Sequence, residues 1–300
     1  MSKMKTFKQL AMIILLLSLS CKSKQNKSFK QDNLPAGKIV KNTAKGNLFI
    51  IGGGKISKSL IKELISTSNL KDNDFIVILP MASEEPDSAS YYAKKSFVDV
   101  GINADKIKTF NLKKEQQSIY QIDSIKRASL VYITGGDQNL FMSQILHTPA
   151  YQAIHTAYQN GATIAGTSAG AAVMSREMIT GIEYKHSQYT GNFRTIESEN
   201  FEIKEGLGLM PSAIIDQHFI YRMRMNRLLS VVLEHPDKKA IGINESTALI
   251  VHGDSAVVSG ESQVIILKNS NKNSIKTKDG LLGGENILID ILLPGEKFKL

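Results

Sequence analysis

The chain has 300 residues, of which 42% are hydrophobic, 7% aromatic and 22% charged. This composition is typical of a folded globular core and excludes a disordered chain or a coiled coil. Residues 1–46 carry the whole formal charge of +9, so the high net charge does not indicate a nucleic-acid-binding body. The single cysteine, Cys21, excludes an internal disulfide framework and a cysteine-based metal site.

Residues 1–20 have the pattern of a targeting segment. Three lysines and no acid precede a short apolar run, AMIILLLSLS. This predicts a secretory signal peptide, because the run is too short to span a bilayer comfortably. Cys21 follows the run and resembles the lipidated cysteine of a bacterial lipobox, although Ser18 stands where leucine is usual. The alternative is an ordinary signal peptide, but a free exposed thiol is a liability in an oxidising compartment. We therefore expect export and a lipid anchor at Cys21 on a bacterial membrane.

Residues 21–46 form the next predicted unit, which begins with the lipidated cysteine. From Lys22 to Gly46 the segment holds seven lysines and one aspartate and has almost no apolar residues. Such a segment cannot bury enough surface to fold, so we expect a flexible basic tether beside anionic lipid head groups. Residues 47–300 are then predicted to form a single catalytic domain.

From Asn47 onward, apolar strands, small-residue turns and helix-like segments alternate. The strands in NLFIIGGG, DFIVILPMAS, SLVYITGGDQ and ATIAGTSAG are almost continuously apolar, which is typical of a parallel sheet covered on both faces. The stretch 246–270 differs, because it has short strands and tight turns. The sequence predicts an α/β fold with a doubly wound, mostly parallel sheet, helices on both faces and a small β-rich C-terminal part.

Three small-residue motifs fall where predicted strands end, the edge at which ligands bind in such sheets. They are GGGK (52–55), TGGDQ (134–138) and GTSAG (166–170). The first lacks the spacing of a nucleotide-binding loop, so we expect no cofactor and interpret its glycines as allowing a tight turn and close backbone approach. GTSAG fits the Gly-x-Ser-x-Gly nucleophile elbow, which would expose the Ser168 hydroxyl in the cleft and place it at a helix N-terminus. A plain small-residue turn is the alternative.

A nucleophilic serine needs a base, and the chain has six histidines. His252, with Asp216 or Asp237, would follow the order of an α/β-hydrolase triad, but it ends a probable strand and runs into a turn. His218 follows the apolar SAII strand at the sheet edge and is the favoured base. A helix over residues 218–229 would place Arg222 on the face of His218, where it could hold a substrate carboxylate.

Several segments resemble cyanophycinases of serine peptidase family S51. They are LFIIGGG, LPMASEEP, YITGGDQ, GTSAGAAVMS, GLGLMPSAIIDQHFIYRMRMNRLL and AIGINESTALIV, in order from about Asn47 to the C-terminus. The resemblance implies a fold like that of class I glutamine amidotransferases and a triad of Ser168 as nucleophile, His218 as base and Glu245 as the orienting acid. It implies no metal or cofactor, a peptide substrate with β-linked aspartate, and a homodimer.

The resemblance also implies roles for the residues around the triad. The backbone N–H groups of Gly136 and Ala169 would form the oxyanion hole. The substrate-binding residues would be Gln138, Asp216, Gln217, Arg222, Arg224 and Arg227. For Arg224 and Arg227, a subunit contact, an ion pair with a helix acid, or a solvated surface position are the alternatives.

The sequence departs from the family pattern in two places. Asn244 and Ser246 flank Glu245, where the resemblance implies acidic residues. The polar stretch 176–200 is long and predicts a lid or insertion over the pocket. Three functions remain open: an exported peptidase for β-aspartyl-arginine polymer or isoaspartyl peptides, an α-aspartyl dipeptidase of the same family, and a catalytically silent surface lipoprotein.

Overall fold

The computed structural model describes residues 46–188, 195–271 and 275–300. The chain divides into two units, Met1–Val40 and Lys41–Leu300, and all elements below belong to the second. The predicted signal peptide, the predicted lipidation site at Cys21 and nearly all of the predicted tether lie outside the described residues. No helix in the described part of the chain is long and apolar enough to cross a membrane.

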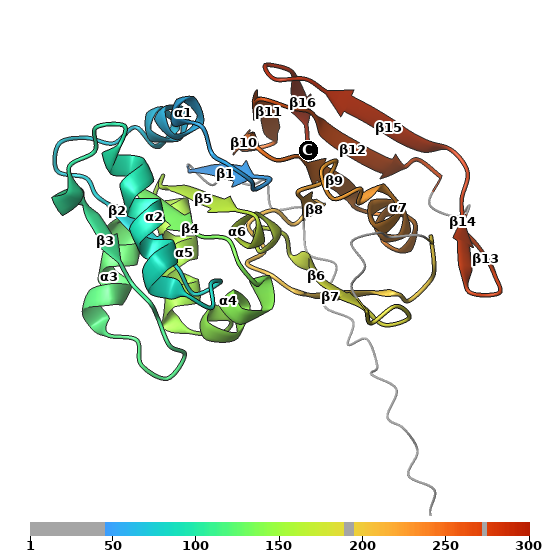
Figure 1. The fold of residues 1–300 in the computed structure, drawn as a ribbon, viewed down its shortest axis with the longest axis horizontal. Coiled ribbons are helices and arrows are strands. Elements are labelled where there is room, and N and C mark those ends of the chain that lie inside the picture. The colour runs from blue at the N-terminus through green and yellow to red at the C-terminus, as the bar shows by residue number, and fades with distance from the viewer. Residues whose placement is uncertain (1–45, 189–194, 272–274) are drawn as a thin grey trace, which may run out of the picture. The chain divides into compact units, whose positions relative to one another are not determined.

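An eight-stranded sheet forms the centre of the fold (Figure 1). Five strands are parallel, as predicted, and the other three extend the sheet beyond β1 in antiparallel fashion. In spatial order the strands are β16 (Lys297–Lys299), β11 (Ser255–Gly260), β10 (Thr247–His252), β1 (Asn47–Ile51), β5 (Thr163–Thr167), β4 (Leu130–Ile133), β2 (Ile76–Leu79) and β3 (Ile107–Thr109).

Helices cover both faces of this sheet, so the doubly wound architecture is confirmed. One face packs against α1 (Lys58–Ser68) and α2 (Pro86–Val98), with Phe49, Tyr132 and Phe97 in the shared core. The other face packs against α3 (Ile119–Arg127), α4 (Gln138–Ile145), α5 (Pro149–Gln159) and α6 (Ala169–Ala172). A short 3-10 helix, Ala104–Lys106, precedes β3. The strands read as apolar runs because each is buried on both sides.

The region after β5 contains a second sheet of four strands, which the sequence analysis did not separate from the first. Its spatial order is β15 (Ile287–Leu292), β12 (Val264–Asn269), β9 (Lys239–Ile243) and β8 (Ala213–Gln217). Strands β8 and β9 are parallel, and the other two pairings are antiparallel. One face packs into the core of the main sheet, and α7 (Met225–Glu234) covers the other. Strands β8 to β12, β15 and β16 are therefore divided between the two large sheets and are not gathered at one edge.

Two hairpins complete the fold. One pairs β6 (Glu177–Glu183) with β7 (Phe201–Glu205), and the other pairs β13 (Lys276–Lys278) with β14 (Leu281–Gly283). The first begins within the polar stretch 176–200, which is predicted to be a lid or insertion, and ends beyond it at Glu205. Residues 189–194 of that insertion lie outside the described residues.

Candidate active site

Ser168 occupies a sharp turn between β5 and α6. Its φ of 53° and ψ of −111° are rare for a residue with a side chain, and such a conformation costs about 1–3 kcal/mol. The Ser168 N–H donates to the Ile51 carbonyl at 3.0 Å, which fixes the turn to the end of β1. A Cβ on Gly166 would lie 2.1 Å from the Gly170 oxygen, and one on Gly170 would lie 2.4 Å from the Ile133 oxygen. Both glycines of GTSAG are thus sterically required, as the elbow interpretation predicts.

His218 and Glu245 complete a hydrogen-bonded series with this serine. The Ser168 Oγ lies 2.8 Å from His218 Nε2. On the other side of the ring, His218 Nδ1 lies 2.5 Å from Glu245 Oε1. His218 follows β8 and Glu245 follows β9, so these neighbouring parallel strands of the second sheet bring the pair together. His218 is only 7% exposed. The structure therefore brings together the three residues of the predicted triad.

The glycine loop that follows β1, residues 52–55, packs directly against the His218–Glu245 pair. The His218 N–H donates to the Gly52 carbonyl at 2.7 Å. A Cβ on Gly53 would lie 2.4 Å from both Cε1 and Nε2 of His218, and one on Gly54 would lie 2.7 Å from Glu245 Oε2. The φ values of Gly53 and Gly54 are +104° and +72°. The GGGK motif is thus a place of close backbone approach, as interpreted from the sequence.

The protonation of His218 is set by its surroundings. Burial lowers its pKa below the ordinary value, and the positive charges of Arg222 and Arg224 act in the same direction. The hydrogen bond and charge of Glu245 oppose this, but the net pKa is lowered. The imidazole is therefore neutral near pH 7, the state in which Nε2 can accept the proton of a serine hydroxyl.

The two N–H groups of the expected oxyanion hole lie beside Ser168. The turn after β4 approaches the serine, since a Cβ on Gly135 would lie 3.3 Å from Ser168 Cβ. The Gly136 N–H donates no hydrogen bond among the described residues. Ala169 is the first residue of α6, where an N–H has no partner within the helix. Because α6 has only four residues, its dipole is small. The expectation that a helix dipole stabilises the oxyanion is therefore corrected, and individual N–H groups are left to do so.

A pocket of about 470 Å3 opens in front of Ser168. Gln138, the first residue of α4, donates from Nε2 to the carbonyls of Ile179 and Thr180 at 2.8 and 2.7 Å. These bonds hold the β6–β7 hairpin beside the serine, so the insertion forms one wall. The hairpin residues carry no motif, so the sequence alone did not single them out as part of the pocket. The lining residues are Gly136, Asp137, Gln138, Asn139, Ser168, Thr180, Gly181, Ile182, Gln217, Arg222, Arg224 and Arg227.

The three arginines occupy two different environments. Arg224 and Arg227 are buried and both bind Asp216, which is 1% exposed. Arg227 Nε donates to Asp216 Oδ2 at 2.8 Å, and Arg224 Nη1 donates to the carbonyl of Gln217 at 2.5 Å and to its side-chain oxygen. Asp216 does not line the pocket, so its expected contact with substrate is corrected to an indirect one through the arginines. For Arg224 and Arg227, the structure shows the ion pair with an acid.

Arg222 is exposed and lines the pocket, but a helix does not place it there. Residues 219–224 form turns, and α7 begins only at Met225, so the prediction of a helix from residue 218 is wrong. One helical-type bond remains, from the Arg222 N–H to the His218 carbonyl at 2.9 Å. The positive φ values of His218 (51°) and Met223 (50°) prevent a continuous helix.

The remaining histidines lie away from the serine. His252 pairs with Asn47 Oδ1 at 2.8 Å at the far end of β10, which agrees with its interpretation as structural. His235 ends α7 and contacts Glu177 at 2.7 Å. His155 is half-buried and contacts the Leu207 carbonyl. Among the described residues, no three His, Cys, Asp or Glu side chains are grouped so that they could hold a metal ion.

A serine, a histidine and a glutamate hydrogen-bonded in series at a nucleophile elbow define the site of a serine hydrolase. Residues 48–259 match the model of peptidase family S51. The cyanophycinases of Trichormus variabilis and a Nostoc species are each 34% identical over 235 residues, or 75% of this chain and of each relative. The Geminocystis herdmanii cyanophycinase is 29% identical over 273 residues, covering 87% of this chain and 96% of the relative.

The fold comparison agrees with these relatives. The crystal structure of a peptidase from an acI-B1 actinobacterium superposes with a TM-score of 0.62 at 24% identity, covering 86% of this chain and 98% of that one. The fold is like that of class I glutamine amidotransferases. The chain therefore belongs to peptidase family S51 and is a serine-type peptidase.

Proposed function

We propose that the protein is an exported serine peptidase that hydrolyses β-aspartyl-arginine polymer, or related isoaspartyl peptides, to dipeptides through an acyl-enzyme. The observation that carries the proposal is the contact series from Ser168 through His218 to Glu245, at the base of a pocket that contains arginine side chains. The named cyanophycinase relatives favour this substrate class over other peptides.

The proposed mechanism assigns one role to each residue of the series. His218 Nε2 takes the proton of Ser168 as its Oγ bonds to the scissile carbonyl carbon, and Glu245 stabilises the imidazolium that forms. The N–H groups of Gly136 and Ala169 donate to the carbonyl oxygen as it becomes negative. The proton on His218 then passes to the leaving amine. Water hydrolyses the acyl-serine by the same transfers in reverse.

Substrate recognition is assigned to the polar residues in front of Ser168. Arg222 is exposed on the pocket wall and its guanidinium can bind a substrate carboxylate through two parallel hydrogen bonds. Gln138 and Gln217 line the same pocket. The Gln138 amide nitrogen already donates to the Ile179 and Thr180 carbonyls, so its side-chain oxygen is the group left to accept from an aspartyl unit. The Gln217 side-chain oxygen accepts from Arg224, so this residue offers its amide nitrogen as a donor. Asp216 contributes indirectly, because its carboxylate fixes Arg224 and Arg227 by ion pairs. These two arginines line the pocket, where a substrate can contact them.

Export and anchoring are part of the proposal and rest on the sequence of residues 1–46. We expect diacylation of Cys21 to hold the enzyme at a bacterial membrane, with the basic tether between the anchor and the catalytic unit. Metabolic labelling with a fatty acid tests this directly. The wild-type chain should incorporate label and fractionate with membranes, whereas Cys21→Ala should do neither. Label on the variant would contradict a lipid anchor at Cys21.

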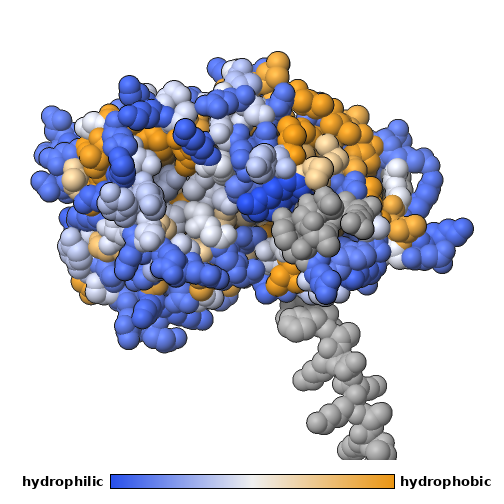
Figure 2. All heavy atoms as spheres, viewed as in Figure 1, coloured by the Kyte–Doolittle hydropathy of each residue, from blue (hydrophilic) through white to orange (hydrophobic). Residues whose placement is uncertain are grey.

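Homodimerisation is also proposed, since the family resemblance implies it. Strand β15 is an edge of the second sheet and exposes Leu288, Ile289 and Ile291, and the exposed Leu293 follows it directly. Figure 2 shows hydrophobic side chains gathered over this region. An exposed apolar edge strand is a surface that a second copy could cover by strand pairing. Light scattering should give twice the monomer mass, and Ile289→Lys together with Ile291→Lys should shift it to that of a monomer; an unchanged mass would exclude this surface.

Dipeptide release tests the proposed activity. The unit from Lys41 onward is incubated with cyanophycin, a β-aspartyl-arginine peptide and an α-aspartyl peptide, and Ser168→Ala serves as the control. We expect release from the β-linked substrates alone, lost in the variant. Cleavage of only the α-peptide would assign the chain to the dipeptidase alternative, and no cleavage of any substrate would favour the silent binding protein.

A further inference from the structure

Ser246 lies where the chain passes from one sheet to the other. Strand β9 of the second sheet ends at Ile243, and β10 of the main sheet begins at Thr247. Ser246 has a φ of 54°, which is unusual for serine. Its N–H donates to the Gly53 carbonyl at 2.9 Å, its carbonyl accepts from the Glu261 N–H at 3.0 Å, and its hydroxyl donates to the Lys55 carbonyl at 2.7 Å. The backbone N–H, the carbonyl and the hydroxyl of Ser246 are thus all hydrogen-bonded.

Two of these bonds end on the glycine loop 52–55, which determines the space available to the His218–Glu245 pair. Gly53 packs against the imidazole of His218, and Gly54 packs against the carboxylate of Glu245. Within the described residues, the side chain of Glu245 hydrogen-bonds only to His218. Its orientation therefore depends on that bond and on the position of the loop. The Ser246 hydroxyl holds the far end of the loop, one residue beyond Gly54.

The residues on both sides of Glu245 use hydrogen-bond donors that an aspartate lacks. Asn244 Nδ2 donates to Ser262 Oγ at 2.8 Å, and Ser246 Oγ donates to a carbonyl. The family resemblance implies an acidic residue at either position, and an ionised carboxylate could only accept. This chain therefore replaces two expected negative charges beside the triad acid with two neutral donors.

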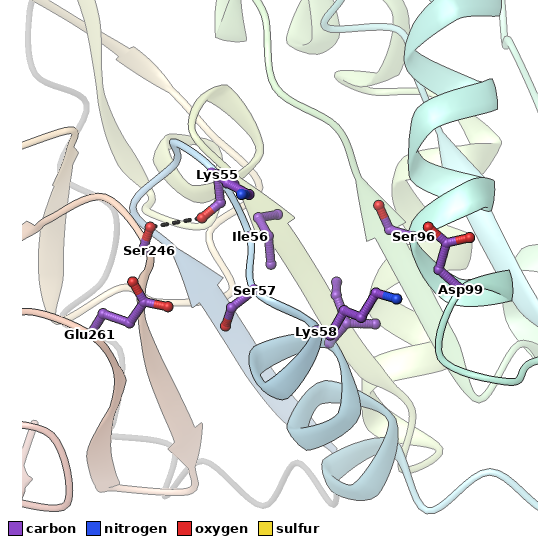
Figure 3. A pocket seen from close by; sticks show the side chains of 9 residues that line it. Lys55, Ile56, Ser57, Lys58, Ser96, Asp99, Ser246 and Glu261 are labelled. Carbon is purple, nitrogen blue, oxygen red and sulfur yellow. Dashed lines mark hydrogen bonds between the residues drawn. The ribbon is translucent and has the colours of Figure 1, made fainter.

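We propose that Ser246 is a positioning residue, whose hydroxyl holds the glycine loop against Glu245 and so keeps the carboxylate aligned with the His218 ring. The proposal rests on the proposed function, because the alignment matters only if the triad is catalytic. Figure 3 shows the bond between Ser246 and Lys55 at the wall of a cavity of about 470 Å3, separate from the substrate pocket. The bond is therefore out of contact with substrate and can be altered without changing the substrate-binding residues.

Substitutions at Ser246 separate the hydroxyl from the backbone conformation. Ser246→Ala removes the hydroxyl and keeps the strained φ, whereas Ser246→Gly removes the hydroxyl and relieves it. Ser246→Asn restores a donor and tolerates a positive φ. Ser96→Ala is the matched control, because Ser96 lines the same cavity from α2 and, in the described part of the chain, its hydroxyl donates only to the Tyr92 carbonyl.

We expect kcat to fall about tenfold in both Ser246→Ala and Ser246→Gly, with KM unchanged, and to recover in Ser246→Asn. Ser96→Ala should match the wild type. The charged groups that face His218 are Glu245, Arg222 and Arg224, and of these only Glu245 raises the imidazole pKa. A misplaced Glu245 should therefore move the acid limb of kcat/KM to lower pH, which a loss of stability alone would not do.

NMR titration of the His218 ring measures the pKa of the imidazole without a substrate. His218→Asn is used to assign the signal. The pKa should be lower in Ser246→Ala than in the wild type and should return in Ser246→Asn. An unchanged His218 titration in Ser246→Ala would overturn the positioning role whatever the activity. A wild type that cleaves no peptide would overturn the proposed function instead, and the titration would still decide the role of Ser246.

Discussion

The two halves of the site are built in different ways. The nucleophile half is close together in the sequence, because Ser168, Gly166 and Gly170 lie within five residues. A Cβ on Gly166 would meet Gly170 of the same turn, and one on Gly170 would meet Ile133 of the neighbouring strand β4. The His218–Glu245 half is long-range, because its residues follow two strands of the second sheet and are 27 positions apart in the chain. The first half depends on the turn and on neighbouring strands of the main sheet, whereas the second depends on how the two sheets are joined.

The glycine loop after β1 is where these halves meet. Ile51 accepts the Ser168 N–H, Gly52 accepts the His218 N–H, and Gly53 accepts the Ser246 N–H. Three consecutive carbonyls thus fix the nucleophile turn, the base and the residue after the acid. The alignment of Ser168 with His218 follows from this shared scaffold.

The largest effect should come from the nucleophile half. Ser168→Ala should lower kcat by about 10⁴-fold or more, because the residual activity comes only from binding and oxyanion contacts. Ser168→Gly should be equally inactive but about 1 kcal/mol more stable than Ser168→Ala, since glycine relieves the strained φ. Steady-state kinetics and urea unfolding measure the two effects. Equal stability of the two variants would show that the turn relaxes and that the elbow is not strained.

Gly53→Ala tests the loop that joins the halves. The new Cβ would lie 2.4 Å from the His218 ring at a φ of +104°, so we expect kcat to fall about 100-fold by displacement of the base. Gly101→Ala is the matched control, because Gly101 has a φ of +103° and nothing within 4 Å of an added Cβ. The control should lose about 1–2 kcal/mol of stability and keep full activity. Similar activity in both variants would show that the loop does not position His218.

Asp216→Asn tests the buried ion pairs that lie next to His218 in the second half of the site. The carboxylate is buried with Arg224 and Arg227, so its neutralisation leaves two buried positive charges poorly compensated. We expect a loss of about 3–5 kcal/mol in the free energy of unfolding by urea, together with weaker substrate binding. Asp99→Asn is the control, because Asp99 forms an exposed ion pair with Lys95. This variant should leave the midpoint of urea unfolding nearly unchanged. Comparable midpoints for the two variants would contradict a structural role for Asp216.

The smallest effect concerns the pH dependence. Burial lowers the His218 pKa and the charge of Arg222 lowers it further, so kcat/KM should stay high somewhat below pH 6.5 and fall as His218 becomes protonated. Arg222→Gln removes one cause of the lowering, so its acid limb should move to higher pH. KM should rise as well if Arg222 binds a substrate carboxylate. If the acid limb of kcat/KM stays in place while KM rises, Arg222 binds substrate but does not affect the pKa of His218.

The local half of the site was the easier to predict from sequence. The two glycines of GTSAG predict a tight turn that leaves no room for side chains at these positions. The apolar runs predict the buried strands of the main sheet. The second sheet was missed, because β8 and β9 read as the same kind of buried strand and periodicity does not assign a strand to a sheet. The helix predicted from His218 failed because the 3.6-residue spacing of the apolar side chains does not reveal the positive φ values at His218 and Met223. The burial of Asp216 was also hidden, since its two arginine partners could equally have bound substrate.

If the two halves meet to activate Ser168, this serine should react with an organophosphate. Diisopropyl fluorophosphate phosphorylates an activated serine oxygen with loss of fluoride, and peptide mapping by mass spectrometry locates the adduct. We expect stoichiometric modification of the peptide that contains Ser168, slowed strongly in His218→Asn. No adduct, an adduct on another serine, or labelling at the same rate in His218→Asn would contradict it.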